Sequence, residues 1–180
     1  SLQTARMTQS AEGQLCGQLY CARADFLRRF RIPEVIIVDD GFIKKMAVSN
    51  LLTEREDSAK RMLIAEGASH VFEAYTRLPD IFATLRRQTA GYILHRWIWE
   101  HLLANKQTDE DAGQTIERLQ KKNPNWSKQV IQNHLHSRHY KTIYRVIIQT
   151  RLTRFKNATD SKKIIQIPFL LIHLIIESIV

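Results

Sequence analysis

The chain has 180 residues, enough for one domain of ordinary size or for a large part of a bigger protein. Hydrophobic residues make up 44 % of the chain and charged residues 25 %, which excludes an intrinsically disordered composition. The formal net charge of +9 favours a polyanionic partner, and two cysteines are too few for a disulfide scaffold, so we expect a reducing compartment.

The first 77 residues combine patterns of strands with patterns of helices. A four-residue β-branched run, VIIV, predicts a buried strand, and the apolar spacing that follows it predicts a helix. The expected strands are 15–22, 35–38 and, within 61–75, either a pair of strands or one strand after a turn. The expected helices are 23–30 and 42–52. We therefore expect an α/β fold with a small mixed sheet in this part of the chain.

Helices are expected over most of the rest. A long helix is predicted from Leu78 to about Asn105, because Pro79 suits a first turn and Asp80 suits the positive end of the helix dipole. A second helix is predicted to begin with Thr108 as its N-cap. The helices expected after Asn105 are 108–122, 127–136 and 140–156.

The positive charge is concentrated in residues 121–163, which hold 11 Lys/Arg against one acid, whereas the remainder holds 16 Lys/Arg and 17 Asp/Glu. Such asymmetry usually marks a surface that meets phosphate. The apolar segment 164–180 follows directly, and it is compatible with a buried core helix, with the first part of a transmembrane helix, or with a helix in the membrane interface. Together the two segments favour an anionic membrane surface, contacted through residues 121–180, over nucleic acid.

Two adjacent acids, Asp39 and Asp40, stand between the β-branched run and the next expected helix. The carboxyl end of a strand is a common place for a ligand site. Neighbouring carboxylates repel each other, which favours one of them as a general base, and Gly41 leaves room for a substrate. The alternative is that the acids only cap the next helix.

The features in chain order are the run 17–23, a short helix, VIIVDD, a strand-like run at 68–75, and a helix that carries Arg86-Arg87-Gln88. This succession resembles the acceptor-binding second half of family 2 glycosyltransferases with the GT-A fold, over roughly residues 13–100. The resemblance implies a partial GT-A-like mixed sheet followed by a helical, basic, membrane-associated C-terminal region. The expected segments are 1–105 (the acceptor-side part of a catalytic domain), 106–163 (a basic helical region) and 164–180 (an interfacial or transmembrane helix).

The resemblance also implies an activity. Asp40 would deprotonate an acceptor hydroxyl, Asp39 would orient or tune it, and the hydroxyl oxygen would attack the anomeric carbon of a nucleotide sugar with inversion. The implied partners are a nucleotide-sugar donor and a glycan or lipid-linked acceptor, at the cytosolic face of a membrane, as in the synthesis of cell-envelope polysaccharides. The residues expected to bind substrate are Gly17, Tyr20, Arg87, Gln88, Arg96 and Trp97.

Two departures from the family pattern limit the expectation. Processive members carry Gln-x-x-Arg-Trp, whereas here the Arg96–Trp97 pair lies eight residues beyond Gln88, so a single-sugar transferase is expected. The nucleotide-binding half with its metal-binding Asp-x-Asp is not among these residues. We therefore expect Mg²⁺ or Mn²⁺ in the complete enzyme, no metal ligand in this chain, and no activity of this chain alone. The triplet 109–111 has the Asp-x-Asp spacing, but it is typical of a helix start.

Other interpretations of the same residues stay open. The main alternative function is a basic helical nucleic-acid-binding module built from the helices 127–136 and 140–156. Core packing is the alternative for Trp97 and Trp99, and a solvated helix face is the alternative for Arg86 and Arg87.

Overall fold

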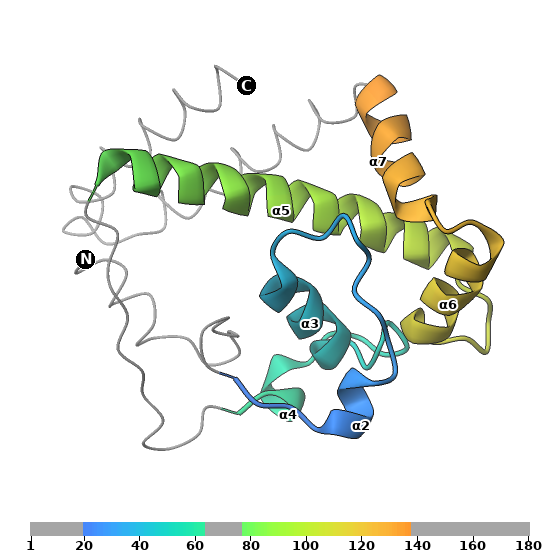
Figure 1. Ribbon diagram of the computed structural model, residues 1–180. Helices are drawn as coiled ribbons and strands as arrows, with labels where there is room; N and C mark the ends of the chain where they lie inside the picture. Colours follow the sequence, from blue (N-terminus) through green and yellow to red (C-terminus); the bar gives the residue numbers. More distant parts are fainter. Residues whose placement is uncertain (1–19, 64–76, 138–180) are drawn as a thin grey trace. The chain divides into compact units, whose positions relative to one another are not determined.

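The computed structural model describes residues 20–63 and 77–137 (Figure 1). The chain divides into two compact units, Ser1–Gln132 and Asn133–Val180, and only residues 133–137 of the second unit are described. All packing discussed below belongs to the first unit. The helices are α2 (Ala24–Leu27), α3 (Asp39–Val48), α4 (Ser58–Arg61), α5 (Leu78–Asn105), α6 (Ala112–Lys122) and α7 (Trp126–His136).

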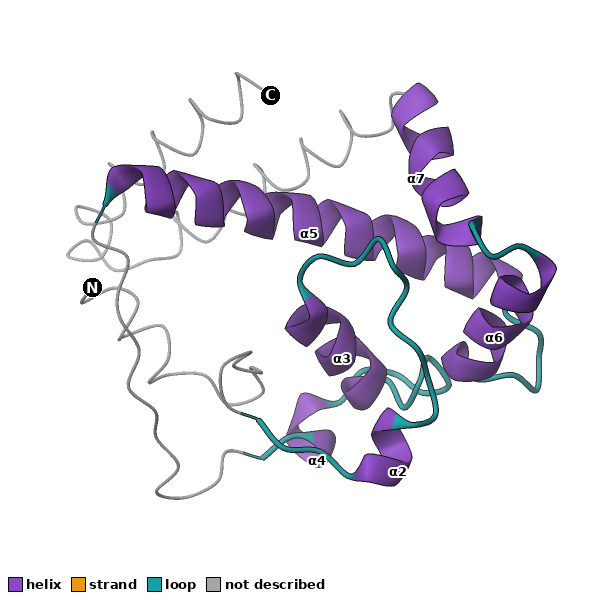
Figure 2. Ribbon diagram, in the orientation of Figure 1, coloured by secondary structure: helices purple, strands orange, loops and turns teal. Residues whose placement is uncertain are grey.

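The described residues form helices joined by loops and contain no strand (Figure 2), so the predicted α/β fold with a GT-A-like mixed sheet is wrong for this part of the chain. The β-branched run 35–38 lies in a turn and a lead-in to α3, where the Ile36 amide donates to the Pro33 carbonyl at 3.0 Å. A strand needs a partner strand and an apolar surface to pack on. Here the run packs on a helix instead, since Val38 contacts α5 beside Gly91. The predicted strand residues 15–19 and 64–75 lie outside the described residues.

Helix α5 confirms the predicted long helix at both ends. Its 28 residues make it about 42 Å long, with Pro79 in the first turn and Asp80 beside it. Helices α3 and α6 both pack against α5, and α4 packs against α3 (Figure 1). The largest fully buried hydrophobic side chains are Phe42, Met46, Leu51, Ile98 and Leu102. The core of the described unit therefore lies between α3 and the C-terminal half of α5.

Helix α3 begins three residues earlier and ends four residues earlier than the predicted helix 42–52, because a left-handed turn follows it. Asn50, Leu51 and Leu52 have φ angles of 46°, 57° and 62°. Such angles are unfavourable for residues with a side chain, and other contacts must offset the strain. The Leu52 amide donates to Ser49 Oγ at 3.0 Å, and the Leu51 carbonyl accepts from the Ala112 amide at 2.8 Å. The turn thereby ties the end of α3 to the start of α6.

Helix α6 begins at Ala112 with Asp111 as its N-cap, so the prediction of Thr108 as the cap is wrong. Asp111 accepts from the Gln114 amide at 2.9 Å, and Gln114 Oε1 accepts from the Asp111 amide at 2.9 Å. This capping box satisfies two backbone donors that a cap at Thr108 would leave to other partners. Asp111 also pairs with Arg29 at 2.8 Å, which fixes the segment after α2 against α6.

The remaining helix predictions have mixed outcomes. Residues 24–27 of the predicted helix 23–30 form α2, and α7 matches the predicted helix 127–136 with one added residue. The predicted helix 140–156 and the apolar segment 164–180 lie outside the described residues. None of the described helices is both long and apolar enough to span a membrane.

Candidate functional site

The candidate site is the acid turn, which we define as residues 38–41. Asp39 and Asp40 occupy the first two positions of α3, and the N-cap residue Val38 makes no side-chain capping bond. Asp39 Oδ1 accepts from the Asp40 amide at 3.1 Å, and Asp40 Oδ1 accepts from the Gly41 amide at 2.7 Å. The positive end of a helix dipole favours carboxylates at these positions. The prediction that the two acids stand at the start of a helix is therefore confirmed, although a turn rather than a strand delivers them.

The two carboxylates differ in their access to solvent. Asp39 is exposed, whereas Asp40 is half-buried. In these two local bonds the backbone N–H groups donate to one oxygen of each carboxylate, Oδ1. A carboxylate has about four lone-pair sites, so each group keeps acceptor capacity for a further donor such as a substrate hydroxyl.

The acid turn is fixed against helix α5 by two residues that the sequence analysis did not single out, Gly91 and His95. A Cβ atom at Gly91 would lie 2.5 Å from Val38 Cγ2, and a Cβ atom at Gly41 would lie 2.8 Å from His95 Cε1. Both distances are shorter than van der Waals contact. The two glycines therefore permit an approach between the turn and α5 that any larger residue would prevent.

His95 lies directly beneath the turn and is 5 % exposed. Burial lowers the pKa of its imidazole, while a hydrogen bond to the Val38 carbonyl and the charges of Asp40 and Asp39 act in the opposite direction. Burial is the largest of these influences, so the ring is neutral near pH 7. Its ring centroid lies 6.2 Å from that of Phe42 and 5.3 Å from that of Trp99.

One flank of this cluster carries a positive charge. Lys45 Nζ on α3 lies 5.0 Å from the centroid of the Trp99 ring, which is within the range of a cation–π contact. Lys45 also forms an ion pair with Glu56. The ammonium group is thus placed by α5 and by the segment before α4, and it adds a second link between α3 and α5.

The other residues expected to bind substrate, where the structure describes them, lie before α2 or along α5. Tyr20 is 38 % exposed, and Arg87 and Gln88 lie on the exposed face of α5. Arg96 pairs with Glu100 on the same helix at 2.8 Å. Trp97 is 2 % exposed, which favours the core-packing alternative. Gly17 lies outside the described residues.

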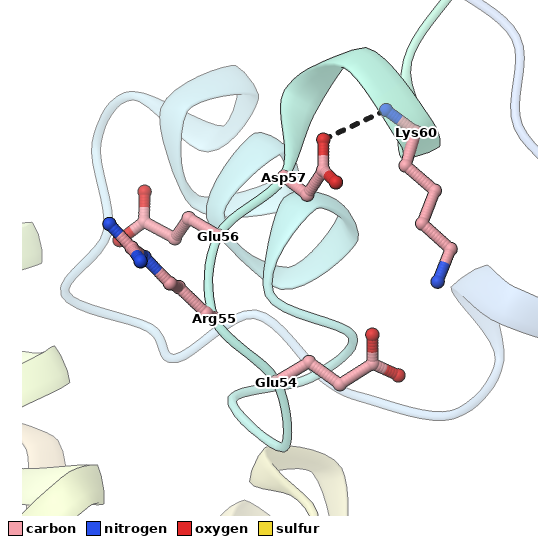
Figure 3. A pocket seen from close by; sticks show the side chains of 5 residues that line it. All are labelled: Glu54, Arg55, Glu56, Asp57 and Lys60. Carbon is pink, nitrogen blue, oxygen red and sulfur yellow. Dashed lines mark hydrogen bonds between the residues drawn. The ribbon is translucent and has the colours of Figure 1, made fainter.

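A second candidate is a shallow depression of about 470 Å³ in the segment that leads into α4 (Figure 3). Three of its acids already have partners in the chain: Glu54 pairs with Arg61 at 2.6 Å, Glu56 pairs with Lys45, and Asp57 Oδ1 accepts from the Lys60 amide at 3.0 Å. These bonds fold the segment and cap α4. The acids that line the depression are therefore engaged in the local structure around α4.

Among the described residues, no group of three or more His, Cys, Asp or Glu is placed to hold a metal ion. The triplet 109–111 illustrates this, because Arg118 pairs with Glu110 at 2.7 Å and Arg29 pairs with Asp111 at 2.8 Å. Its helix-start interpretation fits the observed capping box. Comparison of the chain with protein-family models, with curated proteins and with solved structures found no match.

Proposed function

We propose that the acid turn supplies the general base for an inverting sugar transfer, with Asp40 as the base and Asp39 beside it. The observation that carries the proposal is the half-buried Asp40 carboxylate next to a second acid, in a turn fixed against α5 by Gly91 and His95. A general base must be held in place and must keep a free acceptor site. The Asp40 carboxylate meets both requirements.

The chemistry that follows from this placement is simple. Asp40 takes the proton of an acceptor hydroxyl, and the hydroxyl oxygen forms a bond to the anomeric carbon of a nucleotide sugar. The bond from that carbon to the nucleoside diphosphate breaks, and the diphosphate leaves with the electron pair. The Asp39 carboxylate lies beside Asp40 in the first turn of α3. No metal ligand in this chain is part of the proposal.

The partners of the proposed reaction are a nucleotide-sugar donor and an acceptor with a free hydroxyl, at a membrane surface contacted through residues 121–180. Most of that segment lies outside the described residues, so the membrane contact stays a prediction. The nucleic-acid alternative relies on the same basic segment. Two of its lysines have acidic partners, since Lys121 pairs with Glu117 at 2.8 Å and Lys128 pairs with Glu34 at 2.9 Å. Phosphate would have to compete with these carboxylates.

The test uses the protein translated from the complete reading frame that contains this sequence. Transfer from a panel of radiolabelled nucleotide sugars is measured for the unsubstituted protein and for Asp40→Asn, which keeps the size of the side chain but removes the base. We expect turnover to fall by about 10²–10⁴-fold, the usual contribution of a general base. Folding should be nearly unchanged, because the substitution costs at most about 1 kcal/mol of helix-dipole interaction.

The matched control is Asp109→Asn, which makes the same chemical change at an exposed acid. This variant should keep the turnover of the unsubstituted protein. Retained turnover in Asp40→Asn would remove Asp40 as the base. Binding of nucleic acid with a steep salt dependence, together with no turnover of any nucleotide sugar, would favour the alternative function.

A further inference from the structure

The buried imidazole of His95 is an unusual choice for the place that it occupies. The ring lies between the acid turn, Phe42 and Trp99, and it is 5 % exposed. Its Nε2 atom is buried and has no hydrogen-bond partner. An unsatisfied buried polar atom costs about 1–3 kcal/mol, a cost that an apolar side chain of similar size would avoid. The imidazole therefore lowers stability compared with an apolar side chain of similar size.

The other ring nitrogen explains what the imidazole does there. Since Nε2 has no partner, the bond to the Val38 carbonyl comes from Nδ1, which carries the ring proton. Val38 is the N-cap residue of α3, and the position of a Cβ atom at Gly41 is 3.1 Å from the same Nδ1 atom. His95 of α5 thus contacts both Val38, which precedes Asp39, and Gly41, which follows Asp40.

We propose that His95 is a positioning residue for the proposed sugar transfer: its Nδ1–H group holds the Val38 carbonyl and its ring supports Gly41, so that α5 sets the position of the Asp40 carboxylate. The inference rests on the proposed function of Asp40. The hydrogen bonds within the turn are local, between neighbouring residues, and they restrain the acids relative to α3 only. The contact with His95 restrains them relative to α5.

The test compares two substitutions of His95 in the protein from the complete reading frame. His95→Leu fills much of the space and removes the donor, whereas His95→Asn keeps an N–H group near the position of Nδ1. We expect His95→Leu to lower kcat by about 10- to 100-fold, the loss that follows a displacement of about 1 Å at a reacting group. The KM for the nucleotide sugar should change by less than about threefold, because in the proposal His95 does not contact the nucleotide sugar. His95→Asn should restore kcat to within about fivefold of the unsubstituted protein, since it keeps the hydrogen bond.

Leu102→Ala is the matched control, because Leu102 is fully buried on the same helix, seven residues from His95. It should reduce stability and leave kcat per folded molecule unchanged. A second readout does not depend on activity: in the 180-residue chain, nitrogen NMR should show the His95 proton on Nδ1. The Gly41 amide resonance should shift in His95→Leu and stay in place in Leu102→Ala.

The possible outcomes separate the two proposals. If Asp40→Asn loses turnover while His95→Leu keeps it, the positioning role is wrong and the role of Asp40 stands. A parallel loss of kcat in Leu102→Ala would show that His95 acts only through stability, which also overturns the inference. Retained turnover in Asp40→Asn would overturn the proposed function itself, and the NMR result would then report only on the contact between α5 and the acid turn.

Discussion

The contact between Gly41 and His95 can be tested by placing a methyl group at Gly41. Two effects of Gly41→Ala oppose each other. Alanine favours a helix over glycine by about 1 kcal/mol, which stabilises α3. The new Cβ atom would lie 2.8 Å from His95 Cε1 and 3.1 Å from Nδ1, well inside the usual contact distance of about 3.5–4.0 Å.

The ring of His95 has little freedom to move away. It is buried, it is bonded to the Val38 carbonyl, and the rings of Phe42 and Trp99 lie beside it. Overpacking of this kind costs about 1–3 kcal/mol. After the gain in helix propensity is subtracted, Gly41→Ala should lower the free energy of unfolding by about 0–2 kcal/mol. The single variant is therefore less informative than its combination with a change at His95.

A double-mutant cycle isolates the contact. In a His95→Ala background the atoms that collide with the methyl group are absent, so Gly41→Ala should stabilise the protein by about 1 kcal/mol. The coupling energy between the two positions is then about 1–3 kcal/mol, equal to the overpacking cost. The assay is urea unfolding followed by circular dichroism and by tryptophan fluorescence. Lys44→Gly compared with Lys44→Ala measures the glycine-to-alanine difference elsewhere in α3. A coupling below about 0.5 kcal/mol would mean additive behaviour and would refute the contact.

Two further predictions concern α6 and the segment before it. Gly113→Ala should lower the free energy of unfolding by about 2 kcal/mol, because its Cβ atom would lie 1.9 Å from the Arg29 carbonyl oxygen and backbone atoms cannot rotate away. Urea unfolding measures the loss of stability. A stability equal to that of the exposed control Lys122→Ala would contradict the prediction. The hydrogen-bonded guanidinium of Arg118 lowers the pKa of Glu110 from 4.5 to about 2. Glu110 therefore contributes stability that is complete above pH 4.5 and is lost as the pH falls toward 2. Over this pH range the urea midpoint of Glu110→Gln should approach that of the unsubstituted protein. A difference between the two midpoints that stays constant with pH would contradict the prediction.

Helix predictions succeeded where the signals are local. Pro79 and Asp80 mark the start of α5, and both act within the first turn. The start of α6 was placed too early because Thr108 is a good N-cap residue by itself. The reciprocal pair of Asp111 and Gln114, which has capping-box spacing, is the better signal and is visible in the sequence.

The strand prediction for 35–38 failed for a different reason. A run of valine and isoleucine suits any buried surface, and only the presence of a partner strand makes it part of a sheet. In the structure this surface is the part of α5 around Gly91, which lies 53 residues after Val38 in the chain. No local pattern specifies that pairing. The only hint is Gly91, a glycine in the middle of a long helix, which often marks close packing.

In the acid turn, too, the features set by neighbouring residues could be predicted, whereas the contacts with residues far along the chain could not. The adjacency of Asp39 and Asp40 at a helix start follows from the sequence, because the helix dipole favours acids there. The role of His95 does not, since histidine in the middle of a helix has no pattern of its own. The positioning role of His95 follows only from the contacts of its imidazole with Val38 and Gly41.

Helix α5 connects the two regions for which predictions are made, since both α3 and α6 pack against it. The two glycine substitutions nevertheless meet different neighbours, because Gly41 faces His95 of α5 whereas Gly113 faces the Arg29 carbonyl. Gly113→Ala disturbs the backbone near Arg29 and should reduce stability without moving the Asp40 carboxylate. Gly41→Ala pushes on His95 and should change both stability and the position of the acid turn. If sugar transfer depends on the position of Asp40, the variant with the smaller loss of stability should show the larger loss of kcat. This separation of stability from activity is the result expected if α5 positions the acid turn.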